Sequence, residues 1–396
     1  MTPDPFAASL APLDTPRRLL MGSGPSNAEP RVLRAMSAPP LPPGHPEYTR
    51  LLDKISAGLR AVFATQTPYA LALPGASRSG LEAALASLLE PGDRVLVGVY
   101  GHFGELLCTL AQRHGAVVER VDSDAWGACV DPEAFLSQLR LSRPRLAAIV
   151  HADTSTGIVQ PLEEIGRACR EQDTLLLVDA VLSIGGCELE TEAWCLDVVC
   201  GGLQKCLGGP PGLAPLVCSE QAHAVLQHRR KPPHSTYLDL DRAIQAWRGR
   251  RPDDVPATPM LYALAEALEL VQTEGLAARW ERHCRAGAAL KAGLQALGLR
   301  LFGDERHRAP MIAIVEVPEG VSEAGVRQQL LEEHGIEIMA AFGSLRGRVW
   351  RIGSMGANAR LECVLAVLSA LEAVLASRGV HLDVGAGVTA ARESFR

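Results

Sequence analysis

Between residues 69 and 218, short apolar runs alternate with amphipathic stretches, and this alternation constrains the fold more than any other feature of the sequence. The spacing predicts helices over residues 79–89, 103–114 and 161–172. A repeated strand–helix–strand order is typical of a mostly parallel sheet with helices on both faces. We therefore expect an α/β fold. Its strands are expected at Tyr69–Leu73, Arg94–Val99, Leu146–His151, Leu175–Asp179, Val198–Cys200 and Leu213–Cys218.

The chain has 396 residues, more than a single hydrophobic core usually serves, so we expect two domains. A helical pattern at 48–64 opens the first. A long helical pattern begins at Met260, and behind it come an alternating segment (310–317), a helix (321–334), strands (336–340, 348–352) and a helix (359–378). This order predicts a smaller α+β domain. The expected divisions are an N-terminal arm (1–47), a large domain (48–258), a linking helix with a small C-terminal domain (259–380) and a flexible tail (381–396).

Composition narrows the partners and the compartment. Apolar residues make up 47% and charged residues 21% of the chain, as in soluble globular proteins. The net charge of −6 gives no reason to expect nucleic acid or an anionic membrane as a partner. No apolar run reaches the ~18–20 residues of a membrane span, and the N-terminus shows no secretory signal. Ten cysteines are scattered singly without a CxxC pair, which predicts no metal site and favours a reducing cytoplasm.

Asp179 and Lys205 are the first candidates for chemistry. Asp179 closes a buried apolar run, and Lys205 follows in a small loop flanked by glycines. Pyridoxal 5′-phosphate (PLP) enzymes need such a pair, because the amine forms a Schiff base and the carboxylate keeps the pyridine nitrogen protonated. From the spacing alone, a core strand that ends in a solvated aspartate and an ordinary surface lysine is the alternative.

The loops after the other expected strands carry further candidates, because ligands of parallel sheets bind at the carboxyl ends of strands. Loop 74–80 (PGASRSG) opens directly into a helix, and its small residues and Arg78 suit a phosphate. Phe103 offers a ring that can stack on the cofactor, and loop 151–157 (HADTSTG) offers hydroxyls for its phenolate oxygen. A capping turn and a core phenylalanine are the plainer explanations. Five strand ends with suitable chemistry favour a cofactor site.

Several stretches, spread over nearly the whole chain, resemble one family. The chain is similar to the fold-type I PLP-dependent enzymes of aminotransferase class V. More narrowly, it resembles the alanine–glyoxylate/serine–pyruvate aminotransferases and their relatives of purine catabolism, the (S)-ureidoglycine–glyoxylate aminotransferases. The matching stretches are MGSGPSNAEPRVLRAM (21–36), PGASRSGLEAAL (74–85), LEPGDRVLVGVYGHFGE (89–105), HADTSTG (151–157), VDAVLSIGG (178–186), GGLQKCLGGPPG (201–212) and VWRIGSMGANA (349–359).

The resemblance implies a role for each matching position. Lys205 is implied as the Schiff-base lysine and proton carrier, and Asp179 as the partner of the pyridine nitrogen. Arg351 is implied to hold the substrate α-carboxylate, since a guanidinium binds a carboxylate through two hydrogen bonds. Gly24 is implied to line the substrate pocket. The remaining implied cofactor contacts are Phe103 on the ring, Thr154 on the phenolate oxygen, and Ala76, Ser77, Arg78 and Gln204 at the phosphate.

The implied reaction is transamination between alanine or serine and glyoxylate or another small 2-oxo acid, in a homodimer. Two departures from the family pattern bear on it. Stretch 251–256 (RPDDVP) replaces a Tyr/Asn-His-His-Thr segment that reaches the partner subunit's cofactor, so Val255 stands for a phosphate-binding threonine. Pro43 and Pro252 stand where the ureidoglycine branch has a glutamine and an asparagine for the amide end of its substrate. A site without those groups loses discrimination, and ureidoglycine transamination is therefore the alternative activity.

Two other classes stay open. Cysteine desulfuration needs a cysteine on a mobile loop of the small domain, whereas Cys284 and Cys363 lie in helical patterns. A non-catalytic protein with the PLP fold is supported only by the altered stretch 251–256 and is opposed by Lys205, Asp179 and Arg351. The identities of the amino donor, the acceptor and the pathway are left open by the sequence.

Overall fold

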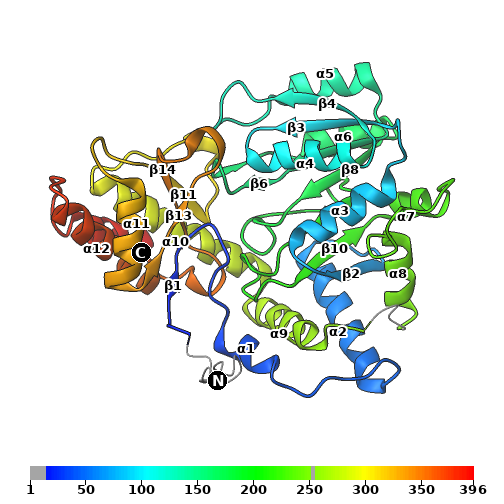
Figure 1. Cartoon of the computed structure of the whole chain (residues 1–396), viewed down its shortest axis with the longest axis horizontal. Coiled ribbons are helices and arrows are strands. Elements are labelled where there is room, and N and C mark those ends of the chain that lie inside the picture. The colour runs from blue at the N-terminus through cyan, green and yellow to red at the C-terminus, as the bar shows by residue number, and fades with distance from the viewer. Residues whose placement is uncertain (1–14, 251–254) are drawn as a thin grey trace, which may run out of the picture.

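The computed structural model describes residues 15–250 and 255–396, which form a larger and a smaller body (Figure 1). Among these residues, seven strands form one sheet in the order β2-β10-β9-β8-β5-β3-β4. Neighbouring strands are parallel except around β10, which is antiparallel to both β2 and β9. The expected α/β fold with a mostly parallel sheet is confirmed. The strands are β2 (Tyr69–Pro74), β3 (Arg94–Val99), β4 (Val117–Asp122), β5 (Leu146–Val150), β8 (Leu175–Asp179), β9 (Val198–Cys200) and β10 (Leu213–Cys218).

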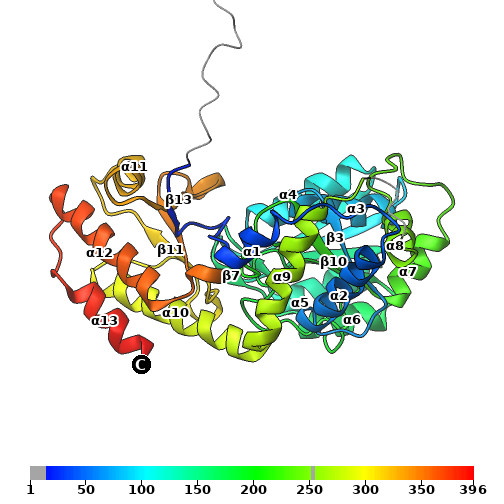
Figure 2. The ribbon, with the colours of Figure 1, turned by 90° about the horizontal axis from the view of Figure 1, so that it is seen from below.

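Helices cover both faces of this sheet. In Figure 2, α3 and α4 lie on one side of the strands, and α5 and α6 lie on the other. No helix within the described ranges is both long and apolar enough to cross a membrane. The helices of the larger body are α2 (Pro46–Val62), α3 (Ser77–Leu88), α4 (His102–Arg113), α5 (Pro132–Ser142), α6 (Glu163–Glu171), α7 (Glu220–Gln227), α8 (Leu240–Arg248) and α9 (Thr258–Glu274).

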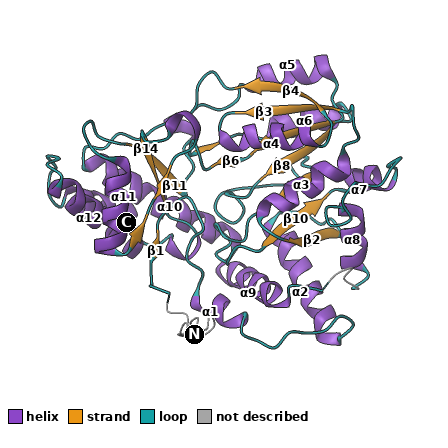
Figure 3. Ribbon diagram, viewed as in Figure 1, coloured by secondary structure: helices purple, strands orange, loops and turns teal. Residues whose placement is uncertain are grey.

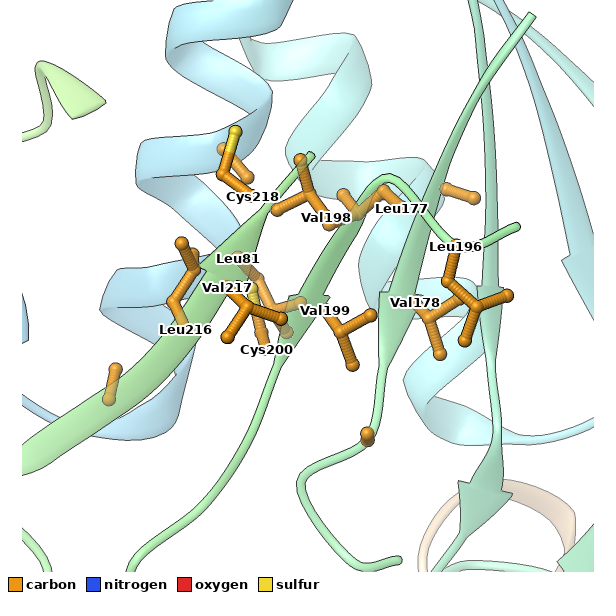
Figure 4. Close-up of a cluster of buried hydrophobic side chains, with 14 of the residues drawn as sticks. Leu81, Leu177, Val178, Leu196, Val198, Val199, Cys200, Leu216, Val217 and Cys218 are labelled. Atoms are coloured by element: carbon orange, nitrogen blue, oxygen red, sulfur yellow. The ribbon is translucent and has the colours of Figure 1, made fainter. Parts of the chain in front are cut away.

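The central strands are apolar along their whole length because both of their faces are buried. Every residue of β5 and β8 is buried, although successive side chains point to opposite faces. Figure 4 shows side chains of β8, β9 and β10 gathered in one cluster with Leu81 of α3 and with Leu196. This core holds the strand ends, and therefore the loops that follow them, in fixed positions.

The smaller body is an α+β unit with its own core. Its antiparallel sheet has the order β11-β14-β13. Figure 3 shows β11 and β14 beside the helices of this body. Trp350, Leu290 and Leu371 are fully buried in this second core. The elements are α10 (Leu276–Ala296), η1 (Glu305–His307), β11 (Ile312–Glu316), α11 (Glu323–His334), β13 (Met339–Ala340), η2 (Gly343–Leu345), β14 (Val349–Gly353), η3 (Gly356–Asn358), α12 (Leu361–Ser377) and α13 (Ala386–Phe395).

The long helical pattern that begins at Met260 forms two helices instead of one. Gly275 separates α9 from α10 and has a φ of +84°. A residue with a side chain rarely adopts this left-handed conformation, so glycine permits the change of direction here. The break lets α9 pack on the larger body while the later turns of α10 enter the core of the smaller one.

The N-terminal arm bridges the two bodies. Its strand β1 (Leu19–Leu20) pairs in parallel with β12 (Ile336–Glu337) of the smaller body. The chain then reaches α1 (Pro30–Ala35), which packs against α9. Between these two contacts, the Ser26 N–H donates to the Gln204 oxygen, so the arm passes over the loop that follows β9.

The C-terminal segment differs from the loose tail that the sequence predicts. Residues 386–395 form α13, which packs against α10 and α12, and Ala391 is fully buried. Glycine makes this contact possible, since a Cβ atom at Gly293 would lie 2.8 Å from the carbonyl oxygen of Gly387. Small residues, which suggest a loose segment in the sequence, here allow two helices to approach closely.

We expect Gly287→Ala to destabilise the protein. Helix propensity alone predicts that this change stabilises α10 by about 1 kcal/mol. A Cβ atom at this position would, however, overlap the carbonyl oxygen of Pro310, and overpacking costs about 1–3 kcal/mol. Thermal unfolding of the variant and of Gln295→Ala, an exposed position on the same helix, measures the effect. An unchanged or raised midpoint for Gly287→Ala would contradict the close contact.

Candidate active site

Asp179 is the last residue of β8 and lies at the edge of the sheet where the parallel strands end. Its side chain is 4% exposed, and its Oδ1 accepts a hydrogen bond of 3.0 Å from the Val181 backbone N–H. Burial raises the pKa of this carboxyl to about 7, and the nearby Lys205 amine opposes that effect. Within the described chain, its Oδ2 has no hydrogen-bond partner. No cationic group lies within ion-pair distance of this carboxyl in residues 15–250 and 255–396.

Lys205 lies in the loop that follows β9 and is also buried. Its Nζ donates a hydrogen bond to the backbone oxygen of Ser23 in the N-terminal arm. Burial, together with the charge of Arg351, lowers the pKa of the amine to about 8. More of the amine is therefore unprotonated near neutral pH than in an exposed lysine, and only the unprotonated form is a nucleophile.

Gly24 closes over the lysine. It has a φ of +97°, and a Cβ atom at this position would overlap Nζ and the side-chain carbons of Lys205. Only glycine fits both the conformation and the space. The predicted substrate-pocket residue therefore lies directly beside the predicted Schiff-base lysine.

The loop after β2 leads into an uncapped helix N-terminus. Ala76 is the N-cap of α3 and makes no side-chain capping bond, while Arg78 is exposed. Ser77 is buried, and its Oγ lies 3.0 Å from Nε2 of Gln204, which donates to it. Backbone N–H groups at a helix N-terminus attract an anion, so this loop and Gln204 form a suitable phosphate site.

Phe103 and Thr154 are held together by a residue that the motifs did not single out. Asp153 is fully buried, and its Oδ2 accepts a hydrogen bond of 3.1 Å from the Phe103 backbone N–H. Its Oδ1 accepts from both the backbone N–H and the hydroxyl of Ser155. Ser155 Oγ in turn accepts from the backbone N–H of His102. Asp153 thus ties the start of α4 to the hairpin of β6 (Ala152–Asp153) and β7 (Ile158–Val159).

Arg351 on β14 brings a buried guanidinium from the smaller body. Its side chain donates from Nε to the Ala340 oxygen at 2.7 Å and from Nη1 to the Thr154 oxygen at 3.3 Å. Burial lowers its pKa to about 10, while the charge of Asp153 acts in the opposite direction. No carboxylate lies within ion-pair distance of it in residues 15–250 and 255–396. A buried cation without a paired anion is costly, so an anionic ligand would bind favourably here.

Two side chains of α10, also missed by sequence reasoning, hold the Lys205 loop and the turn that follows β14. Arg279 is 5% exposed and donates from Nη2 to the backbone oxygens of Cys206 and Leu207 at 2.7 and 3.2 Å. His283 Nε2 accepts from the Gly356 backbone N–H at 3.0 Å. Both lie inside a helical pattern without any motif, so nothing in the sequence marked them.

The residues present fit PLP. Asp179 offers an unpartnered carboxylate oxygen for a protonated pyridine nitrogen, and Lys205 offers a buried amine. The uncapped start of α3 offers backbone donors for a phosphate. No cluster of three or more His, Cys, Asp and Glu side chains able to hold a metal ion occurs in the part of the chain that the structure describes.

Comparisons with known proteins point in the same direction. The aminotransferase class-V family model matches residues 45–347. The (S)-ureidoglycine–glyoxylate transaminase of Bacillus subtilis (strain 168) is 42% identical over 402 residues, with 97% of this chain and 96% of that protein covered. The alanine–glyoxylate aminotransferase of Drosophila melanogaster is 37% identical over 381 residues, with 94% and 96% covered.

Solved structures agree with these sequence relatives. The ureidoglycine–glyoxylate aminotransferase of Bacillus subtilis has a TM-score of 0.95 at 43% identity, covering 97% of this chain and 100% of that one. The alanine–glyoxylate aminotransferase of Nostoc sp. has a TM-score of 0.91 at 41% identity, covering 94% and 99%. A cysteine desulfurase of Thermococcus onnurineus, at 17% identity and a TM-score of 0.72, shares the fold alone.

We expect Asp179→Asn to stabilise the ligand-free protein, increasingly so as the pH rises to about 7. Burial raises the pKa of this carboxyl to about 7, above the unfolded value of about 3.9. Between these values the folded state binds more protons than the unfolded state, so the wild type loses stability relative to the uncharged variant as pH rises. The gain in melting temperature should therefore grow up to the folded pKa and then level off.

Asp304→Asn provides a control of opposite sign, because hydrogen bonds from Arg306 hold the pKa of Asp304 below its usual range. A difference between Asp179→Asn and wild type that stays constant from acid to neutral pH would show that Asp179 is not a desolvated carboxylate.

Proposed function

This chain belongs to the class-V aminotransferase family, and from that premise we propose that it transfers the amino group of alanine or serine to glyoxylate or another small 2-oxo acid. It is a PLP-dependent enzyme. The observation that carries the proposal is the arrangement of three buried charged groups: Lys205, Asp179 and the guanidinium of Arg351, which has no carboxylate partner in the described chain. An amino acid or a 2-oxo acid supplies the carboxylate that such a guanidinium requires.

We assign the cofactor contacts as follows. Asp179 would hold the pyridine nitrogen, Phe103 would stack on the ring and Thr154 would bond the phenolate oxygen. The phosphate would bind at the start of α3. The residues assigned to the phosphate are Ala76, Ser77, Arg78 and Gln204.

Each assigned side chain has a defined task. Bound PLP supplies an electron sink for the pair of electrons left at the substrate Cα. Arg351 orients the substrate by its carboxylate, so that Cα faces the amine of Lys205. Lys205, whose pKa is lowered to about 8, would take the proton from the substrate Cα and return it to the cofactor carbon that is bonded to the transferred nitrogen. Asp179, which accepts a hydrogen bond from the Val181 N–H, would keep the pyridine nitrogen protonated.

Transamination of (S)-ureidoglycine is the second candidate, because a relative of that activity is 42% identical to this chain. The residues at the amide end favour alanine or serine instead. Pro43 is exposed and has no hydrogen-bond donor, and Pro252 lies outside the described residues. Initial rates with alanine, serine and (S)-ureidoglycine, each against glyoxylate, distinguish the two candidates. Desulfuration has less support, because Cys284 and Cys363 lie within α10 and α12 and not on loops.

We further propose a cytoplasmic homodimer. All ten cysteines are free thiols, which supports a reducing compartment. The side chain of Val255 is 92% exposed and that of Tyr237 is 56% exposed. Both border an apolar cavity of about 250 Å³ beside the edge strand β2. A second subunit would cover this exposed apolar surface, and the segment that contains Val255 would contact that subunit.

We expect Lys205→Ala to abolish transamination while leaving the protein folded. The change removes both the amine that bonds the cofactor and the group that moves the proton, so the rate should fall by at least ~10³-fold. Lys291→Ala is a matched control, since burial also lowers the pKa of Lys291 to about 8 and its Nζ donates to the Ala309 backbone oxygen, away from the candidate site.

Two readouts test the assignment. Pyruvate release from alanine and glyoxylate measures turnover. Borohydride should fix the visible chromophore covalently to the wild type and to Lys291→Ala, but not to Lys205→Ala. Turnover by Lys205→Ala at a near wild-type rate would refute the assignment of the amine.

We expect Val255→Thr to tighten PLP binding by about 1 kcal/mol, because it adds one hydrogen-bond donor for the partner subunit's phosphate. Without it, the phosphate is held mainly by its own subunit. The neighbouring Asp253 and Asp254, which we expect to turn away from the phosphate, lie outside the described residues. Equilibrium dissociation of PLP measures the change, and Val384→Thr, at a 78% exposed position elsewhere, is the control. A monomer in solution, or equal affinities, would contradict this arrangement.

A further inference from the structure

The ring of Phe342 contacts three side chains of the candidate site. The guanidinium carbon of Arg351 lies 4.3 Å from the centroid of this ring. The His102 ring stacks against it, with centroids 4.5 Å apart and an interplanar angle of 26°. The Phe103 ring meets it edge to face, with centroids 6.1 Å apart. One side chain thus joins the predicted carboxylate-binding arginine to the predicted cofactor-stacking ring.

These contacts cross between the two bodies. Phe342 and Arg351 belong to the smaller body, whereas His102 and Phe103 open α4 in the larger one. The start of α4 is itself tied to the hairpin that carries Thr154, through Asp153. The Phe342 ring therefore lies where Arg351, Phe103 and the hairpin that carries Thr154 come together.

The backbone places Phe342 there with little freedom. It lies two residues beyond Ala340, whose carbonyl oxygen already accepts from Arg351 Nε. The next residue, Gly343, has a φ of +54°, and a Cβ atom there would lie 2.8 Å from Cη2 of Trp126. The turn between β13 and β14 therefore packs closely against Trp126 of the larger body, which fixes the backbone beside Phe342.

The remaining donors of Arg351 define what the contact does. Nε and Nη1 bond the oxygens of Ala340 and Thr154, and no bond from Nη2 to the described chain is found. The free donors must therefore be aimed by packing, and a guanidinium packs well on an aromatic face. The charge of Arg351 also lowers the pKa of Lys205, which indicates that the two groups share one site.

We propose that Phe342 is a specificity-determining residue, which holds the Arg351 guanidinium toward the α-carboxylate and closes the space beyond a small substrate side chain. This inference deepens the proposed function and rests on it. The ring fixes the direction of the free donors. With His102 and Phe103 it forms an aromatic wall beside the position where Cα faces Lys205. An amino donor the size of alanine or serine fits against this wall, whereas a longer side chain would clash with it.

Three variants separate this role from simple packing of the turn. Phe342→Leu keeps most of the side-chain volume but removes the aromatic ring, whereas Phe342→Tyr keeps the ring. Phe302→Leu is the matched control, because Phe302 is also half-buried, packs against a cluster that contains Ala341 beside Phe342, and takes no part in the site. Thermal unfolding of all three shows whether each one is folded.

Steady-state kinetics with alanine and glyoxylate give the first readout. Phe342→Leu should raise the KM for both substrates on the order of tenfold, with kcat changed less than about threefold. Phe342→Tyr and Phe302→Leu should behave like the wild type. Phe342→Ala should raise kcat/KM for norvaline relative to alanine. A Phe342→Leu enzyme with wild-type KM values would overturn the proposal, as would an equal fall in kcat for all donors.

Binding of propionate, an unreactive carboxylate, gives a second readout that does not depend on turnover. Calorimetry on the PLP-loaded protein should show affinity weakened several-fold in Phe342→Leu and unchanged in Phe342→Tyr and Phe302→Leu. If the wild type binds propionate in this way but transfers no amino group from any small donor, the proposed function fails and the role of Phe342 stands. Equal affinity in all the proteins would overturn the role of Phe342 itself.

Discussion

Burial of charged groups without full counter-charges is the constraint on which this structure depends. Asp179, Lys205 and Arg351 are 4%, 9% and 4% exposed. Burial shifts each pKa toward the neutral form, to about 7, about 8 and about 10. Buried charges are costly unless they are paired, so binding of complementary charges would stabilise this arrangement. A ligand with a cationic ring nitrogen and a substrate with a carboxylate would supply them, and would stabilise the fold by binding.

The fold distributes these groups over two bodies and then joins the bodies through backbone hydrogen bonds. The carboxylate and the amine come from the parallel sheet, and the guanidinium comes from β14. Helix α10 contacts both bodies near these groups. Arg279 donates a hydrogen bond to the Cys206 oxygen, and Arg282 donates one to the Gly356 oxygen. Bonds of this kind fix the main chain of each loop. Helix α10 therefore ties the loop that carries the amine to the turn that follows β14.

Much of the scaffold could be predicted, because periodicity reports burial directly. The expected strands follow from apolar runs. Asp179 was singled out because it ends one such run, and Lys205 because it lies in a glycine-flanked loop soon after another. Gly275 and α13 were missed, since a single glycine in a helical pattern and a segment rich in small residues do not reveal which surfaces they bring together. Asp153 and Phe342 were missed for a related reason: their partners lie far away in the sequence.

The sequence by itself determined the class of fold and the kinds of chemical group at the strand ends, because both depend on residue types at regular spacings. Only the tertiary structure decided the pKa values and the orientations of those groups. The lowered pKa of Lys205 comes from burial and from the charge of Arg351, residues far apart in the chain. The direction of the Arg351 guanidinium comes from the Ala340 oxygen and the Phe342 ring. Desolvation, charge proximity and ring contact are properties of packed neighbours, and neighbours in space exist only once the chain has folded.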